Sequence, residues 1–108
     1  MSAPGSEQRK LRAGVVGLGW AGRQHMAAYA GSPDVELVAL AGMEVEPMQQ
    51  LGDQYGIAED HRYSDWKDLV ASGDLDVLSI ATPTTLHAPI AVAALDAGIH
   101  VLSEKPMA

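Results

Sequence analysis

The amino-acid sequence predicts an α/β fold, in which a doubly wound parallel sheet is covered by helices on both faces. First, short apolar runs alternate along the chain with segments of helical periodicity, which is typical of βαβ units. Second, a glycine-rich turn at 17–22 directly follows the first apolar run. Third, the run at 35–41 is apolar at nearly every position, as in strands that are buried on both faces.

The N-terminal third of the chain predicts one complete βαβ unit. We expect a strand at 11–16, a helix at 20–30 and a second strand at 35–41. The helix places Met26, Ala27 and Ala30 on one face, and the sequence Gly31-Ser32-Pro33-Asp34 ends it with residues that favour turns.

The middle of the chain predicts two shorter helices. The first runs from about Pro47 to Gly56, with an apolar stripe of Met48, Leu51 and Tyr55. The connection 57–63 has room for a short third strand. Ser64 is a suitable N-cap for the second helix, 65–71, whose apolar contacts are Trp66, Leu69 and Val70.

The C-terminal third predicts a strand, a helix and a last strand. The strand at 76–81 is halted by Thr82-Pro83. The helix runs from about His87 to Ala97, with Pro89 in its first turn and Gly98 after its end; its inward residues are Ile90, Ala93, Ala94 and Ala97. The last strand is expected at 99–102, so the sheet is expected to be incomplete, because the chain ends after about its fifth strand.

Composition excludes several classes of function. The 108 residues form one domain, and they include no cysteine, so a thiolate nucleophile and a cysteine metal site are excluded. The four histidines lack metal-ligand spacing, and we expect no metal. From Ala13 onward, 13 acidic residues face four basic ones, a balance that repels nucleic acid and anionic membranes. We expect a cytoplasmic protein with a disordered leader at 1–10.

The turn after the first strand has the pattern G-x-G-x-x-G. Gly17 lets the chain leave the strand sharply, Gly19 removes a Cβ where a pyrophosphate comes close, and Gly22 lets helix and strand pack tightly. The phosphates of a dinucleotide would then lie on free N–H groups at a positive helix end.

Other segments are expected at the same edge of the sheet as this turn. In an open parallel sheet, ligands bind outside the carboxyl ends of the strands, where the connections go to opposite sides. Gly42, Met43 and Glu44 follow the second strand, and the loop from Thr82 to His87 follows the fourth. The sequence Glu104-Lys105-Pro106 follows the last strand and opens onto this edge.

The sequence resembles the N-terminal Rossmann domain of the Gfo/Idh/MocA oxidoreductases, the family of glucose-fructose oxidoreductase and inositol dehydrogenase. The resemblance covers essentially all of 11–108, which we take as an NAD(P)-binding domain. It rests on three motifs: Gly17-x-Gly19-x-x-Gly22 with His25, the run Asp76-Val77-Leu78-Ser79-Ile80-Ala81-Thr82-Pro83 with His87, and Ala97-Gly98-Ile99-His100-Val101-Leu102-Ser103-Glu104-Lys105-Pro106.

The resemblance implies a dehydrogenase that transfers a hydride between NAD or NADP and a hydroxyl or carbonyl of a sugar, cyclitol or related polyol. It makes Lys105 the catalytic residue, beside the nicotinamide and the substrate hydroxyl. The implied cofactor-binding residues are Gly17, Leu18, Gly19, Trp20, Ala21, Gly22, Gly42, Met43, Glu44, Ala81, Thr82, Pro83, His87, Glu104 and Lys105.

The chain departs from the family in two places. It ends at Ala108, before the C-terminal domain that forms the substrate pocket, supplies the general acid or base and usually makes the homo-oligomer interface. Gly42 stands where NAD-preferring relatives commonly carry an Asp on the ribose. A small residue there leaves room for a 2′-phosphate, whereas Glu44 and Glu46 repel one, so the choice between NAD and NADP stays open.

Two other functions are compatible with the glycine turn. A non-catalytic dinucleotide-binding module, which senses redox state or serves as an interaction domain, needs no second domain. A methyltransferase would use the same turn for S-adenosylmethionine, but its chemistry gives the Glu104-Lys105-Pro106 sequence no role.

Overall fold

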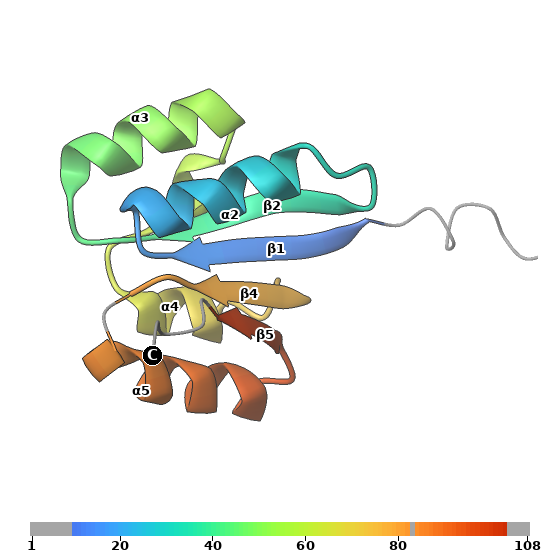
Figure 1. Ribbon diagram of the computed structural model, residues 1–108, viewed down its shortest axis with the longest axis vertical. Coiled ribbons are helices and arrows are strands. Elements are labelled where there is room, and N and C mark those ends of the chain that lie inside the picture. Colours follow the sequence, from blue (N-terminus) through green and yellow to red (C-terminus); the bar gives the residue numbers. More distant parts are fainter. Residues whose placement is uncertain (1–9, 83, 104–108) are drawn as a thin grey trace, which may run out of the picture.

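The sheet is parallel throughout and has the strand order β3-β2-β1-β4-β5. The computed structural model describes residues 10–82 and 84–103 (Figure 1). In this part of the chain the strands are β1 (Leu11–Val16), β2 (Val35–Ala41), β3 (Arg62–Tyr63), β4 (Val77–Ile80) and β5 (His100–Ser103). The α/β fold class predicted from the alternating pattern is therefore confirmed.

The helices form one layer on each face of the sheet (Figure 1). Two helices, α2 (Trp20–Ala30) and α3 (Val45–Tyr55), cover one face. The 3-10 turn η1 (Glu59–His61) leads into β3. On the opposite face lie α4 (Trp66–Ala71) and α5 (Thr84–Asp96). The connections change faces between β3 and β4, so β1 and β4 are the neighbours at which the strand order reverses.

The apolar strands divide the core into two parts because successive side chains point to opposite faces of a sheet. Val15 on β1 packs under α2 and α3 with Met26 and Leu40. Val16, the next residue, packs on the other side with Leu69 and Ile90 of α4 and α5. Burial of both faces explains why these strands carry runs of apolar residues rather than an alternating pattern.

Two helices begin two or three residues earlier than predicted. Helix α5 begins at Thr84, three residues before the predicted start at His87, so Pro89 lies inside the helix and His87 is not its N-cap. A proline here removes one internal hydrogen bond, which the long helix tolerates. Helix α3 begins at Val45 rather than Pro47.

The buried face of α2 also differs from the prediction. Gly22, Met26 and Tyr29 are its buried residues, whereas Ala27 and Ala30 are exposed. Alanine carries too little apolar area to decide which face of a helix packs against the sheet. The larger Tyr29 side chain is the one that the sheet covers.

The end of α5 agrees with the prediction from Gly98. This residue has a left-handed backbone, with φ of +80°. The amide of Gly98 donates to the carbonyl of Leu95 at 3.0 Å, and that of Ile99 donates to Ala94 at 2.9 Å. The pair of bonds is a Schellman motif, which directs the chain from α5 into β5.

Candidate cofactor site at the carboxyl edge of the sheet

Two glycines of the turn between β1 and α2 are required by the chain's own packing. Gly17 has φ of +106°, and a Cβ on it would lie 2.6 Å from the carbonyl oxygen of Ala81. A Cβ on Gly22 would collide with the carbonyl oxygen of Gly17. These two positions allow β1 to turn sharply and α2 to pack closely against the turn, as the sequence pattern predicts.

Gly19 has no such requirement. Its backbone is extended, with φ of −80° and ψ of −165°, a conformation open to any residue. No heavy atom in the described part of the chain lies within 4 Å of the position that its Cβ would take. Gly19 precedes the first residue of α2, where backbone N–H groups have no partner inside the helix. The turn is therefore open where an anion would approach the helix end.

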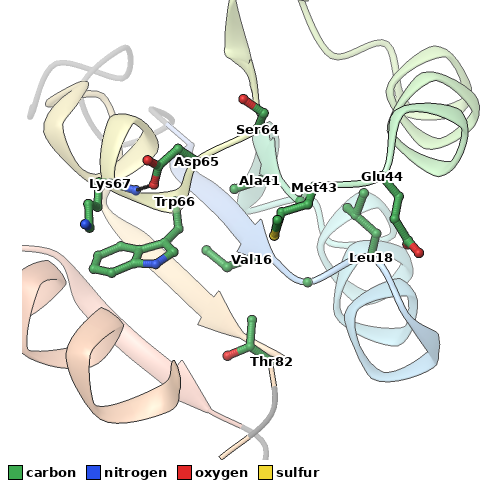
Figure 2. Close-up of a pocket in the computed structure, with 12 residues that line it drawn as sticks. Val16, Leu18, Ala41, Met43, Glu44, Ser64, Asp65, Trp66, Lys67 and Thr82 are labelled. Atoms are coloured by element: carbon green, nitrogen blue, oxygen red, sulfur yellow. Dashed lines mark hydrogen bonds between the residues drawn. The ribbon is translucent and has the colours of Figure 1, made fainter. Parts of the chain in front are cut away.

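A cavity of about 600 Å³ lies beside this turn, at the carboxyl ends of β1, β2 and β4 (Figure 2). Its volume is within the usual range for small-molecule sites. Figure 2 shows the side chains of Trp66, Met43 and Thr82 around Val16. The lining residues are Val16, Gly17, Leu18, Ala41, Gly42, Met43, Glu44, Ser64, Asp65, Trp66, Lys67 and Thr82.

A second cavity, of about 380 Å³, adjoins the first on the side of α3. The two cavities share four residues: Gly42, Met43, Glu44 and Ser64. The other lining residues of the second cavity are Val45, Met48, Gln49, Glu59 and Arg62.

Two buried polar atoms at this edge have no protein partner. Within residues 10–82 and 84–103, neither Oγ1 of Thr82 nor Nε2 of His87 makes a hydrogen bond. Buried polar atoms are nearly always paired, with protein, water or a ligand. Both residues were predicted to contact the cofactor, and their free polar atoms fit that role.

Residues 64–67 form a wall of the larger cavity that the sequence prediction missed. The short strand β3 pairs with β2, Arg62 beside Leu40 and Tyr63 beside Ala41. The amide of Gly42 donates to the carbonyl oxygen of Tyr63 at 3.0 Å, which brings the start of α4 to the cavity. The sequence does show a helix N-cap directly after a possible third strand. Only the pairing of β3 with β2, however, places the start of that helix at the cavity.

The N-cap of α4 is Asp65, not Ser64 as predicted. Oδ1 of Asp65 accepts a hydrogen bond of 2.9 Å from the amide of Lys67. Nζ of Lys67 lies 5.9 Å from the centre of the Trp66 ring. These contacts hold the Trp66 side chain and a positive charge at one side of the cavity (Figure 2).

The structure brings six of the predicted cofactor-binding residues together around the larger cavity: Gly17, Leu18, Gly42, Met43, Glu44 and Thr82. Others lie beside it. Gly19, Trp20, Ala21 and Gly22 form the start of α2, where the Trp20 side chain is 77% exposed, and Ala81 lies against Gly17. Three of the predicted cofactor-binding residues lie outside the described part of the chain: Pro83, Glu104 and Lys105. Positions 1–9 of the predicted leader also lie outside it.

Arg23 supports the turn from α2. Its Nε donates to the carbonyl oxygen of Leu18 at 3.0 Å. This contact fixes the peptide between Leu18 and Gly19 and places a positive charge next to the glycine turn. Among the residues that the structure describes, no group of three or more metal-ligating side chains is present, and no helix has the length and hydrophobicity needed to cross a bilayer.

Comparison with known proteins matches the chain to one family of proteins. A family model, described as an oxidoreductase family with an NAD-binding Rossmann fold, matches residues 11–108. Levoglucosan dehydrogenase from Pseudarthrobacter phenanthrenivorans is 34% identical over 108 residues, which cover 93% of this chain and 27% of that protein.

Two solved structures are similar to this chain over most of its length. One is scyllo-inositol dehydrogenase from Lactobacillus casei with bound NAD(H) and scyllo-inositol, with a TM-score of 0.83 and 30% identity over 91% of this chain and 28% of that one. The other is biliverdin reductase from Synechocystis with biliverdin and NADP⁺, with a TM-score of 0.81 and 32% identity over 89% of this chain and 29% of that one. The chain thus spans less than a third of the length of these relatives.

Proposed function

Because the chain belongs to the Gfo/Idh/MocA family of oxidoreductases, which has an NAD-binding Rossmann fold, we propose that it is the cofactor-binding domain of a dehydrogenase. The dehydrogenase transfers a hydride between a nicotinamide cofactor and a hydroxyl or carbonyl of a sugar, cyclitol or related polyol. The substrate class is supported by relatives named for levoglucosan and for scyllo-inositol.

The observation that carries this proposal is the open position at Gly19. Gly17 and Gly22 lack a Cβ because protein atoms occupy the space, but no described atom lies near the Cβ position of Gly19. A glycine that neither the backbone conformation nor the packing needs makes room for a group from outside the chain. Its place at the N-terminus of α2 suits the pyrophosphate of a dinucleotide.

The remaining parts of the dinucleotide follow from this anchor. Met43 and Trp66, which line the larger cavity, would hold the adenosine, and Oγ1 of Thr82 and Nε2 of His87 would hydrogen-bond to the cofactor. When bound, the nicotinamide supplies the hydride chemistry. Ala81, Pro83 and Glu104 are the further residues that we propose to contact the cofactor.

Lys105 is the proposed catalytic residue. Strand β5 ends at Ser103, and Lys105 follows two positions later in the sequence. Its ammonium group hydrogen-bonds the substrate hydroxyl that becomes a carbonyl, and it stabilises the negative charge that develops on that oxygen.

The setting of the complete protein is part of the proposal. The substrate pocket and the general acid or base come from a further domain, and the protein is a cytoplasmic homo-oligomer. The acidic surface of this chain argues against nucleic acid and anionic membranes as partners.

Titration calorimetry with NADH tests the cofactor site through two matched glycine substitutions. In Gly19→Val, a side chain fills the open position, so NADH affinity should fall by about 100-fold or more, whereas the melting temperature should fall by only a few degrees, because Val is a poorer N-cap of α2 than Gly. In the control, Gly31→Ala at the other end of α2, the new Cβ would lie 3.4 Å from its nearest neighbour, and affinity should be unchanged.

Two results would overturn the proposal. One is that the unsubstituted protein binds neither NADH nor NADPH at millimolar concentration. The other is that Gly19→Val binds NADH as tightly as the unsubstituted protein does, because the cofactor would then not lie on this turn.

A further inference from the structure

Met43 is the most exposed methionine that the structure describes. Its side chain is 87% exposed, whereas Met26 of α2 is fully buried and Met48 of α3 is partly buried. Met43 lies in the loop between β2 and α3, at the carboxyl edge of the sheet. Because an oxidant in solution must reach the sulfur atom, Met43 is the most accessible of these three thioethers.

The thioether of Met43 faces the proposed cofactor site. Figure 2 shows this side chain pointing into the larger cavity, with its sulfur atom towards the side on which Val16 and Trp66 lie. Met43 lines both cavities. Apolar residues also line the larger cavity: Val16, Leu18, Ala41 and Trp66. An oxygen atom added to this sulfur would therefore stand in the space that the proposed site gives to the adenosine.

The composition of the chain directs an oxidant to methionine. The chain has no cysteine, so no thiol of its own competes for a peroxide. Its five methionines are Met1, Met26, Met43, Met48 and Met107. The structure describes three of them, and of these three only Met43 combines high exposure with a place in the wall of the larger cavity.

We propose that Met43 is a site of reversible oxidation by hydrogen peroxide, and that its sulfoxide weakens dinucleotide binding. This inference rests on the proposed function, because it assigns regulation to the same cofactor site. A lone pair of the sulfur attacks one peroxide oxygen, an S–O bond forms and the O–O bond breaks. The attacked oxygen passes its proton to the departing one, which leaves as water. The thioether is oxidised by two electrons, and the peroxide is reduced by two.

The sulfoxide replaces an apolar group of the cavity wall with a polar one. Its oxygen accepts hydrogen bonds from water while the cavity is open. A dinucleotide held by Met43 and Trp66 would remove that water, and burial of a polar atom without a partner costs free energy. The loss should fall on binding rather than on folding, because Met43 belongs to neither part of the buried core.

Peroxide treatment followed by titration calorimetry with NADH tests this inference. Peptide mass spectrometry should show the added oxygen on Met43 before Met48, and none on the buried Met26. Once the excess peroxide has been removed, the treated protein should bind NADH about threefold to tenfold more weakly, at an unchanged melting temperature. The two methionine sulfoxide reductases, supplied with a thiol reductant, should restore the affinity.

Met43→Leu and Met48→Leu are the matched variants, since each replaces a thioether with an apolar side chain of similar size. The quantity compared is the ratio of NADH affinity before and after peroxide within each variant. This ratio should be close to one in Met43→Leu, and in Met48→Leu it should equal that of the unsubstituted protein. Saturating NAD⁺ during the treatment should slow the oxidation of Met43 several-fold, because the bound dinucleotide covers the sulfur.

The outcomes distinguish this inference from the proposed function. If the untreated protein binds no dinucleotide, the proposed function fails and the regulation fails with it. If NADH does bind, the role of Met43 is overturned by any of three results. Met43 is not oxidised before Met48, the oxidised protein binds NADH as tightly as the untreated protein, or Met43→Leu loses as much affinity on treatment as the unsubstituted protein does.

Discussion

Ser79 and Tyr29 form a polar pair inside the apolar core. Ser79 is fully buried in the middle of β4, and Tyr29 on α2 is 8% exposed. The hydroxyl oxygens of the two residues lie 2.5 Å apart, so one hydroxyl donates a hydrogen bond to the other. Burial raises the pKa of the Tyr29 phenol above its ordinary value of 10.0, and the hydrogen bond with Ser79 opposes part of that rise. The pair links the C-terminal end of α2 to β4.

The raised pKa of Tyr29 predicts a loss of stability in alkali. The folded protein holds the phenolic proton more tightly than the unfolded chain does, so this contribution is fully present below pH 10.0 and is lost as pH rises through the folded pKa. Urea unfolding from pH 8 to 11 should show the decline, and Tyr29→Phe should remove the part that belongs to this residue.

Tyr29→Phe also leaves the Ser79 hydroxyl unpaired and should lower the free energy of unfolding at pH 7 by about 1–3 kcal/mol. The double variant Tyr29→Phe/Ser79→Ala should lose less than the sum of the single variants, because it leaves neither hydroxyl without a partner. Strict additivity would contradict the pairing. Tyr55→Phe, at a partly buried position on α3, serves as the control for removing a phenolic hydroxyl.

The position of the short helix α4 in the fold was the hardest to predict, although the sequence pattern of the helix itself was recognised. Its apolar contacts are those expected: Leu69 and Val70 are buried, and Trp66 packs against the core. Its role as a cavity wall depends on β3, a strand of two residues whose place is decided by pairing with β2. Such a strand has too few residues to show a period, so the chain alone could not place α4 at the cofactor edge.

Two adjacent substitutions test how α4 is held. Asp65→Ala removes the bond to the Lys67 amide and should lower the free energy of unfolding by about 0.5–2 kcal/mol. It should also weaken NADH binding severalfold, because the wall that contains Trp66 loosens. Ser64→Ala should cost less than about 0.5 kcal/mol, since Ser64 is exposed and does not cap the helix. A larger loss in Ser64→Ala than in Asp65→Ala, measured by urea unfolding, would show that the helix begins one residue earlier.

At the scale of the whole molecule, the site results from the change of the connections from one face of the sheet to the other. The connections cover one face of the sheet up to β3 and the other face from α4 onward, so the loops after β1 and β4 diverge at adjacent strands. The crevice that results is where open α/β sheets bind ligands. The glycine turn, Gly42 to Glu44 and Thr82 come from three separate loops and meet there.

The enzyme function predicts that binding and turnover respond differently to the loss of Lys105. In the protein assayed with sugars and cyclitols, Lys105→Ala should reduce kcat by about 100-fold or more and change NADH affinity by less than about threefold. Lys10→Ala, at an exposed position before β1, should change neither. Unaltered turnover in Lys105→Ala, with every active substrate, would remove the catalytic role and favour a non-catalytic dinucleotide-binding module.

The sequence by itself determined the order of the elements and the nature of the turn. Helix α2 was predicted at its observed bounds, as were β1 and β2, because periodicity and glycine or proline signals are local. The glycine spacing also predicted the sharp turn between β1 and α2, since Gly17 has the positive φ that this turn needs.

Only the tertiary structure decided what surrounds that turn. Leu18 fills the space at Gly42, Arg62 is held by Asp53 and Ile57, and residues 64–67 form the wall opposite Met43. Each of these facts depends on side chains from different strands or helices, whose distances are set by sheet pairing and helix packing. Sequence spacing encodes the local turn but not these distances, so the kind of site was predictable, whereas the side chains that surround the turn were not.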